Sequence, residues 1–363
     1  MGGPLTIQER RRYAWFVLPL LIGVLLAVTV VANSGYQWMR LEQLQQRFSQ
    51  GVRTPAPPPR VPAERNVSNE RNNDLLARMQ LNLVVNAAAG LALLISIVFL
   101  GTRLRYYLRA RRWEQQLSLG RTVQSQLIPS ADAGGRHMRI AAEFVPALEL
   151  GGDLYDVFSL EDGRVAFALG DVAGKGLPAA LLMGQIHGAV RSNPWHRGPA
   201  EHVEFARQLN SMLYGRTQEA RSASLFWGVY DPFENRLRYV SAGHCASFLV
   251  RSNEVERLDS TGPVLGLLTE PYFNYEEVAF DAGDLLVLYS DGIIEGVNAA
   301  GEEFGEDRLF AALNRHRGAT AEEARTEILR DYRAFVGRTE AGDDLTLLVL
   351  EASPALVGEL AAA

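Results

Sequence analysis

Aspartate lies near glycine at four places in the sequence where a strand or a turn is expected to end. The local sequences are ELGGDLYDVF around Asp153, LGDVAGKG around Asp171, LYSDGIIEG around Asp291 and GDDLTLLVL around Asp343. Because glycine has no side chain, the backbone can turn sharply there, and carbonyl oxygens can approach a bound ion. Carboxylate and carbonyl oxygens are the ligands that Mg²⁺ and Mn²⁺ prefer. The four aspartates are therefore candidate metal ligands.

A metal site requires these four carboxylates to meet in space. Converging carboxylates repel each other unless they are protonated or neutralised, and a bound divalent cation neutralises them most simply. One aspartate beside glycine is by itself an ordinary turn. The prediction therefore depends on all four sites acting together.

Four other polar residues are candidates for roles at or around the site. Asp156 and Asp344 are expected to surround the ligands rather than to bind metal, because neighbouring residues of a strand point to opposite faces; ligation by either is the open alternative. Lys175 is either a phosphate contact or a solvated loop cation. His244 is either a structural residue at the end of a strand or a catalytic one.

The composition indicates a folded protein that does not bind nucleic acid. Of the 363 residues, 47% are hydrophobic and 21% are charged, which is enough apolar material for a sizeable core. The formal net charge of -6 is unlike the strongly basic domains of nucleic-acid-binding proteins. Cys245 is the single cysteine, which excludes an internal disulfide and a cysteine-rich zinc site. A reducing compartment therefore suits the main domain.

Two apolar segments have the length of transmembrane helices. Residues 14–32 and 81–100 contain no charged residue, and about 20 such residues cross a hydrocarbon core of about 30 Å. A cleaved signal peptide is the alternative for the first segment, although its apolar run is longer than usual for one. Arginines before the first segment and after the second predict that both flanks are cytoplasmic. The predicted order is a cytoplasmic N-terminus (1–13), a transmembrane helix (14–33), an extracytoplasmic loop (34–80), a second transmembrane helix (81–101), a signalling or linker helix (102–130), the main domain (131–352) and a C-terminal tail (353–363).

The linker segment is predicted to be helical up to the residue before Pro129, because proline disfavours helical geometry at the residue before it. Its residues follow the four-three spacing of a coiled-coil seam, which predicts a homodimer through residues 103–128. A helix that caps the following domain is the alternative, and both can hold. The seam consists of Tyr106, Ala110, Trp113, Leu117, Gly120, Gln124 and Leu127, of which Gly120 and Gln124 are defects.

The main domain is predicted to have an α+β fold. From about His137, short β-rich runs alternate with turns. The turn sequences EDG, DPFEN and DAGD predict hairpins and hence antiparallel sheets. Helices fit residues 177–192, 199–215 and 320–336. Long runs of strands followed by blocks of helix favour this fold over a parallel βαβ sheet.

Several long motifs resemble the stage II sporulation protein E family of metal-dependent serine/threonine phosphatases, which includes regulators of sigma-factor partner switching. The resemblance covers about residues 115–351, through GGDLYD, GDVAGKGLPAALLM, SAGH, GPVLGLL, LYSDGIIEGVNAAGEEFGEDRL and DDLTLLVL. It implies a sandwich of two antiparallel β-sheets flanked by helices, with metals at one edge. After SAGH the family commonly has a polar residue and proline, whereas this chain has Cys245 and Ala246.

The resemblance also implies a metal centre with two Mn²⁺ or Mg²⁺ ions. Asp171 is the implied bridging ligand. Asp291 and Asp343 are the other implied protein ligands of one ion, and Asp153 and the Val172 carbonyl are those of the second ion. A water between the two ions then attacks the phosphorus of phosphoserine or phosphothreonine. The implied partner is a phosphorylated anti-sigma-factor antagonist or a similar signalling domain. The implied location is the bacterial inner membrane, crossed more than once, with the catalytic domain in the cytoplasm.

Two other classes of protein compete with this interpretation. A nucleotide-binding enzyme is suggested by GDVAGKG, but a Walker A loop needs Ser or Thr after its lysine, and Gly176 follows Lys175. GGDLY shares only three residues with the signature of diguanylate cyclases. The second class is a phosphatase-like binding module that has lost catalysis, and the retained aspartates argue against it.

Overall fold

The computed structural model describes residues 64–130, 133–193, 195, 198–214, 222–339 and 342–353, together with residues 23, 25, 28–40, 42–43 and 46 near the N-terminus. The chain divides into two compact units, residues 1–114 and residues 115–363.

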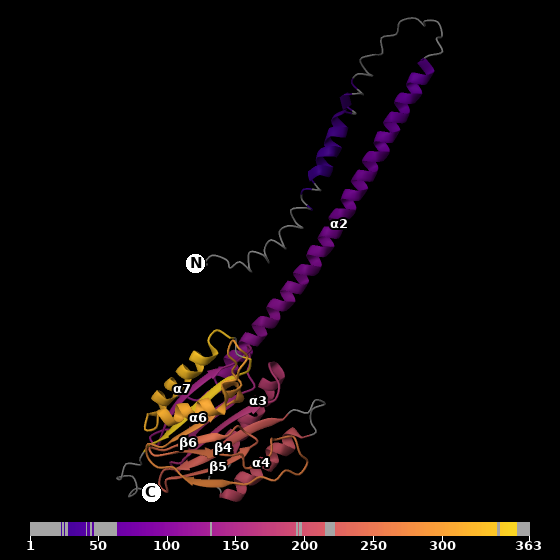
Figure 1. Cartoon of the computed structure of the whole chain (residues 1–363). Helices are drawn as coiled ribbons and strands as arrows, with labels where there is room; N and C mark the ends of the chain where they lie inside the picture. Colours follow the sequence, from indigo (N-terminus) through magenta and orange to yellow (C-terminus); the bar gives the residue numbers. More distant parts are fainter. Residues whose placement is uncertain are drawn as a thin grey trace. The chain divides into compact units, whose positions relative to one another are not determined.

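The first unit contains most of one long helix, α2 (Glu64–Ser125), drawn in purple in Figure 1. Within it, Asn73–Ser125 is long and apolar enough to cross a membrane, with a mean hydropathy of 2.5 over its most apolar window. None of that window is buried. In the described part of the chain this is one candidate span, so the prediction of two is not confirmed. The predicted first span, 14–33, lies mostly outside the described residues.

The linker segment is helical as far as Ser125, three residues before the predicted end, and a turn follows. The helix also begins at Glu64, inside the segment predicted as an extracytoplasmic loop. The last residues of the predicted seam, Gln124 and Leu127, belong to the second unit and pack against the rest of it. Gln124 is only 7% exposed, and Leu127 packs against a hydrophobic cluster of the domain. The capping alternative therefore holds for the end of the helix.

The second unit contains two antiparallel sheets, as predicted, and each has five strands. In the first sheet the order is β1 (Met138–Val145), β10 (Leu345–Ala352), β9 (Leu285–Tyr289), β6 (Ser247–Val250) and β7 (Val255–Leu258). In the second sheet it is β2 (Leu154–Ser159), β3 (Val165–Val172), β4 (Ala223–Asp231), β5 (Arg236–Ala242) and β8 (Glu276–Ala279).

Two of the three predicted hairpins are present. The EDG sequence joins β2 to β3, and DPFEN joins β4 to β5, each between paired antiparallel strands. The third prediction is wrong, because DAGD connects β8 of one sheet to β9 of the other. A turn signal fixes a change of chain direction but not the sheet that the next strand joins.

Helices cover the outer faces of both sheets (Figure 1). The helices α3 (Leu177–Ser192) and α4 (Pro199–Leu213) pack on the second sheet, and Pro178 and Pro199 lie at their starts, where a missing N–H is harmless. The first sheet is covered by α5 (Asp291–Ile294), α6 (Gly305–Arg315) and α7 (Ala321–Val336). Thr320 and Glu323 form a capping box that starts α7.

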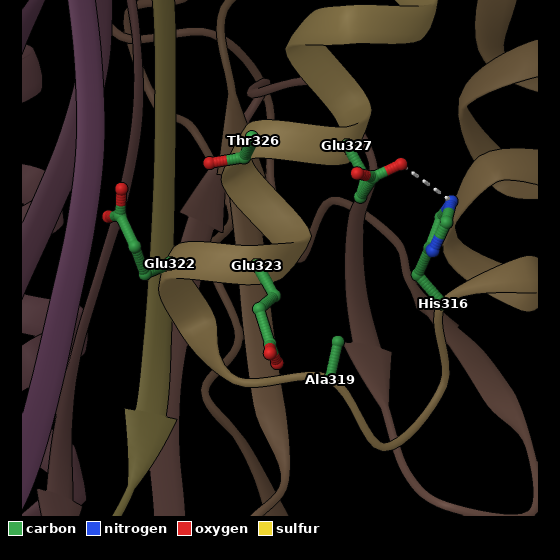
Figure 2. Close-up of a pocket in the computed structure, with 6 residues that line it drawn as sticks. All are labelled: His316, Ala319, Glu322, Glu323, Thr326 and Glu327. Carbon is green, nitrogen blue, oxygen red and sulfur yellow. Dashed lines mark ion pairs between the residues drawn. The ribbon is translucent and has the colours of Figure 1, made fainter.

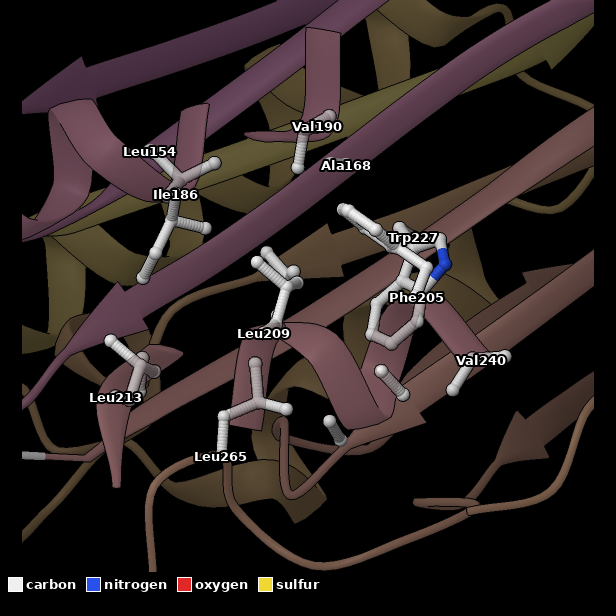
Figure 3. Close-up of a cluster of buried hydrophobic side chains, with 14 of the residues drawn as sticks. Leu154, Ala168, Ile186, Val190, Phe205, Leu209, Leu213, Trp227, Val240 and Leu265 are labelled. Atoms are coloured by element: carbon white, nitrogen blue, oxygen red, sulfur yellow. The ribbon is translucent and has the colours of Figure 1, made fainter. Parts of the chain in front are cut away.

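The strands are apolar on both faces because each sheet lies between two hydrophobic layers. In β9, Leu286 and Leu288 face the other sheet, whereas Val287 faces the α6 and α7 layer. This alternation follows the two-residue period of a strand. Figure 3 shows the layer between the second sheet and its helices, where Phe205 of α4 meets Trp227 of β4 edge-on at 5.6 Å. The domain is thus an α+β sandwich with helices outside.

Candidate metal centre

The predicted ligands all lie at strand ends on the same edge of the sandwich. Asp171 is near the end of β3, and Asp153 immediately precedes β2, whose first residue pairs with Gly170. Asp291 starts α5 two residues after β9. Asp343 lies two residues before β10, the neighbour of β9. Antiparallel pairing brings the start of each strand beside the end of its neighbour, so the ligands meet in pairs.

Repulsion and burial change the acidity of these carboxyl groups. The pKa of Asp171 is raised from 3.8 to about 6, chiefly by burial and then by the charge of Asp291. Burial, then the charge of Asp171, raises the pKa of Asp153 well above its ordinary range. The pKa of Asp291 is raised by burial and by the charges of Glu295 and Asp343. The four predicted ligands therefore lie within electrostatic reach of one another.

The metal-free protein should lose stability as pH rises. The folded state keeps the Asp171 proton up to about pH 6, whereas the unfolded chain releases it near 3.8. Stability is therefore highest below that window and falls through it, by about 2–3 kcal/mol for this group. The measurement is urea unfolding in EDTA at pH 4.5 and 7.5, repeated at pH 7.5 with Mn²⁺, which should restore the loss. Asp171→Asn, which lacks the titrating carboxyl group, gives the change in unfolding free energy that other groups cause between the two pH values. The electrostatic argument would be contradicted if the wild type showed the same change as this variant.

The residues fit a hard divalent cation, although they do not enclose one tightly. Their donors are all oxygens, and a Cβ on Gly152 would lie 2.9 Å from the Val172 carbonyl oxygen and 3.5 Å from Asp171 Oδ1. Glycine at this position keeps open the space where those oxygens converge. Among the described residues, no three His, Cys, Asp or Glu side chains are gathered closely enough to hold an ion. Mg²⁺ usually keeps several water ligands beside one or two carboxylates.

Two hydroxyl residues that the sequence reasoning missed support Asp153. Thr346 Oγ1 donates a hydrogen bond to Asp153 Oδ2 at 2.5 Å. Ser290 also favours the ionised form of Asp153, and its own Oγ accepts the Thr346 backbone N–H at 2.9 Å. Both lie within three residues of a predicted ligand on the sequence, which is the only signal that could have identified them.

Asp344 holds the loop that carries Asp153. Its Oδ1 accepts the Ala147 backbone N–H at 2.7 Å, and its Oδ2 accepts the Gly152 N–H at 2.5 Å. Both carboxylate oxygens are therefore occupied by backbone groups. This arrangement agrees with the expectation that Asp344 surrounds the ligands.

Asp156 is fully buried and joins β2 to α3. Arg191 donates two hydrogen bonds to its carboxylate, at 2.6 and 2.7 Å, and His187 Nε2 lies 3.2 Å away. The Arg191 guanidinium also lies over the Phe158 ring, 4.5 Å from its centroid. Asp156 is thus paired with the Arg191 guanidinium and positions α3 behind the site. Nothing in the sequence pattern had indicated Arg191.

His244 is buried near the site but touches none of the predicted ligands. Its Nδ1 lies 2.9 Å from Ser224 Oγ, and Ser224 pairs with Asp171 across β4 and β3. Burial lowers the pKa of His244 to about 4, so the imidazole is neutral near pH 7. The next residue, Cys245, is close enough to Asp291 and Asp171 that their charges, after burial, raise its pKa. The geometry favours the structural alternative for His244.

The C-terminal end of α2 is hydrogen-bonded to the loop before Asp153. Gln124 Nε2 donates to the Gly151 carbonyl at 2.9 Å, and Gln124 Oε1 accepts the Gly151 N–H at 3.2 Å. A Cβ on Gly120 would lie 3.3 Å from the Leu150 side chain. Gly120 and Gln124, the two defects of the predicted seam, are therefore the residues that contact this loop.

A separate pocket lies between α6 and α7 (Figure 2). Its acidic residues already have partners: Glu327 lies 3.7 Å from His316 Nε2, and Glu323 belongs to the capping box. Glu322 pairs with Arg325. None of the residues that line it is a predicted site residue; they are His316, Ala319, Glu322, Glu323, Thr326 and Glu327.

Comparison with known proteins identifies the domain. The sequence pattern of the stage II sporulation protein E (SpoIIE) family matches residues 161–353, which is more than half of the chain. The chain belongs to this family. The match includes Asp171, Asp291 and Asp343, whereas Asp153 lies before it.

Curated relatives include protein IcfG of Synechocystis sp., 29% identical over 265 residues, which cover 65% of this chain and 41% of IcfG. The phosphoserine phosphatase RsbU of Bacillus subtilis is 27% identical, over 65% of this chain and 70% of RsbU. The phosphoserine phosphatase RsbP of the same species is 23% identical, over 58% of its length. The chain thus spans only part of each relative. The second unit contains the SpoIIE-family domain, and two of its curated relatives are named phosphoserine phosphatases.

Solved structures agree on the fold. The SiaA-PP2C domain of Pseudomonas aeruginosa gives a TM-score of 0.57 at 22% identity, covering 67% of this chain and 98% of that one. The PP2C phosphatase domain of SpoIIE from Bacillus subtilis gives 0.52 at 19% identity, over 59% and 63% of the two chains. The two antiparallel sheets with outer helices are therefore those of a PP2C-like α+β fold.

Proposed function

We propose that this chain is a membrane-anchored protein phosphatase that hydrolyses phosphoserine or phosphothreonine on a partner signalling protein. The observation that carries the proposal is the group of mutually repelling carboxylates at one edge of the sandwich. Asp171 and Asp153 have raised pKa values because they are buried and close together. Such a group fits a centre that divalent cations neutralise.

The ligand assignment is also a proposal. Asp171 would bridge two Mn²⁺ or Mg²⁺ ions; Asp291 and Asp343 would complete one set of protein ligands, and Asp153 with the Val172 carbonyl the other. Such ions supply, when bound, a water nucleophile at neutral pH and positive charge for the phosphoryl oxygens.

The residues of this chain prepare that site. Thr346 holds Asp153 by its hydroxyl group, and Asp344 fixes the backbone at Gly152. The Asp156 and Arg191 pair fixes α3, which follows the loop after Asp171. Because these supports are buried or half-buried, the ligands are held in place before any ion or substrate binds.

The test is hydrolysis by the full-length chain in detergent micelles. Phosphate release from a phosphoserine peptide should require Mn²⁺ or Mg²⁺ and stop with EDTA. ATP and GTP, used as competing substrates, should be hydrolysed far more slowly. Folded protein that binds Mn²⁺ without turnover would support the alternative, a phosphatase-like module that signals by binding alone.

The proposed partner is a phosphorylated anti-sigma-factor antagonist-like domain. This rests on membership of the SpoIIE family and on relatives that are named phosphoserine phosphatases. Comparing the phosphoproteins retained by an inactive Asp171→Ala chain and by the wild type would identify it. Retention of no phosphoprotein by the inactive chain would count against this partner class.

The membrane anchor is proposed to be the apolar part of α2, at residues 81–100, which lies within the helix that is long and apolar enough to span a bilayer. The same helix continues to Ser125 and contacts the loop before Asp153 through Gln124. We therefore infer that α2 influences the position of Asp153.

Replacing Gln124 should test this coupling. Gln124→Ala leaves the Gly151 backbone groups without their partners, so Mn²⁺ affinity should fall by about tenfold, as for other residues that support ligands. Calorimetric titration with Mn²⁺ measures it, and Gln116→Ala, an exposed position on the same helix, is the matched control. Unchanged Mn²⁺ affinity in the Gln124 variant would show that α2 only covers the domain.

A further inference from the structure

Lys175 is the only lysine among the 36 lysine and arginine residues of this chain. Every other basic position uses arginine, whose planar group forms paired hydrogen bonds, whereas lysine is a compact point charge on a flexible stem. Lys175 also lies between two glycines with positive φ angles, 104° at Gly174 and 74° at Gly176. In the described structure, a Cβ on either glycine would meet nothing within 4 Å. The loop therefore gives the lysine stem freedom to move.

The ammonium group of Lys175 binds the loop that carries a predicted metal ligand. Its Nζ lies 2.9 Å from Asp343 Oδ2 and donates to the Gly342 carbonyl at 2.5 Å. An ammonium has three N–H donors, so these contacts account for two of them. About half of the side chain, 46%, is exposed. The third donor is therefore available to a ligand that approaches from solvent.

A phosphorylated substrate needs positive charge at this edge. A phosphoserine carries about −1.5 to −2 charges near pH 7, and it must approach Asp171, Asp291 and Asp343. Divalent cations bound there would offset the charge of these carboxylates, and a nearby ammonium would add to the attraction. In the part of the chain that the structure describes, Lys175 is the cation paired with a predicted ligand. Arg191, by contrast, is paired with Asp156 behind the site.

We propose that Lys175 binds the phosphoryl oxygens of the substrate, and that it exchanges Asp343 for them when that carboxylate binds a divalent cation. The inference deepens the proposed function and rests on it. A cation at Asp343 offsets the charge that attracts the ammonium, so the attraction between Lys175 and Asp343 weakens. A phosphoryl oxygen then becomes the stronger acceptor. A compact ammonium suits this exchange, because a guanidinium held by two hydrogen bonds would release its carboxylate less readily.

A purely structural interpretation makes different predictions. If Lys175 only joined its loop to that of Asp343, removing its charge would loosen the ligand. Mn²⁺ affinity and stability would then fall together. In the exchange that we propose, the ammonium competes with the metal ion, so removing its charge raises Mn²⁺ affinity while lowering phosphate affinity. The opposite directions separate the two interpretations.

The experiment uses the full-length chain in micelles, with the variants Lys175→Met, Lys175→Arg and Arg330→Met. Arg330 is an exposed cation on α7, paired with Glu327, and serves as the control. Calorimetry measures Mn²⁺ affinity first, and then the affinity for inorganic phosphate in saturating Mn²⁺. Lys175→Met should bind Mn²⁺ about threefold to tenfold more tightly and phosphate about tenfold more weakly. Lys175→Arg should recover part of the phosphate affinity, and Arg330→Met should match the wild type.

Neither measurement requires turnover, so the two proposals can fail separately. Unchanged phosphate affinity in Lys175→Met, in a chain that hydrolyses phosphoserine, would overturn the inference and leave the phosphatase intact. Reduced Mn²⁺ affinity in Lys175→Met would overturn it in favour of the structural interpretation. Both expected shifts in a chain without hydrolysis would support the binding role of Lys175 and remove the proposed activity.

Discussion

Asp171→Asn is expected to lower phosphoserine hydrolysis by at least about a thousandfold, a loss typical of removing a group on which transition-state stabilisation depends. The amide keeps the shape of the side chain but loses the negative charge that would bridge two cations. In EDTA at pH 7.5 the same substitution should make the protein more stable, because a buried and repelled carboxylate is gone. Phosphate release from a phosphoserine peptide and urea unfolding measure the two effects.

Misfolding of the variant could not produce both expected effects, because hydrolysis should fall while stability in EDTA should rise. A misfolded variant would lose activity and stability together, whereas the expected variant gains stability without metal and loses the stabilisation that Mn²⁺ gives the wild type. Asp259→Asn is the matched control, since this exposed aspartate pairs with Arg257 at the surface. Activity within tenfold of the wild type in Asp171→Asn would exclude Asp171 as a bridging ligand.

The strands other than β7, and the placement of the candidate ligands at strand ends, could be predicted because their causes are local. Two-residue alternation, turn sequences and glycine beside aspartate are visible within about ten residues. The DAGD turn shows the limit. Its sequence predicts a hairpin, which is wrong, because the sheet that β9 joins is decided by contacts of Leu286 and Leu288 with residues far away in sequence. No short window contains that information.

The residues that support the site were missed for the same reason. Thr346 and Arg191 act on Asp153 and Asp156, which are 193 and 35 residues away in the chain. Each is an ordinary residue for its strand or helix, and only the folded chain gives it a partner. The defects at Gly120 and Gln124 were visible in the pattern of the linker helix. Their meaning needed the loop at Leu150 and Gly151, which they fit.

Gly292→Ala should disrupt the same edge of the sandwich by steric conflict alone. A Cβ on this buried glycine would lie 2.0 Å from the Asp344 backbone oxygen and 2.9 Å from its carbonyl carbon. Backbone atoms cannot rotate away as a side chain can, so α5 and the strand entering β10 must separate. We expect a loss of about 2–3 kcal/mol in the free energy of unfolding, at the upper end of the cost of overpacking.

The functional effect of Gly292→Ala should exceed its effect on stability. Separating α5 from β10 moves Asp291 away from Asp343, the two residues proposed to bind one ion, so Mn²⁺ affinity should fall by at least about tenfold. Urea unfolding and Mn²⁺ calorimetry test the two parts. Gly188→Ala is the control, because this exposed position on α3 has open space around it and alanine stabilises a helix by about 0.5–1 kcal/mol. If Gly292→Ala kept the Mn²⁺ affinity of the wild type, the proposed sharing of one ion by Asp291 and Asp343 would be wrong, because the substitution acts on the backbone that brings them together.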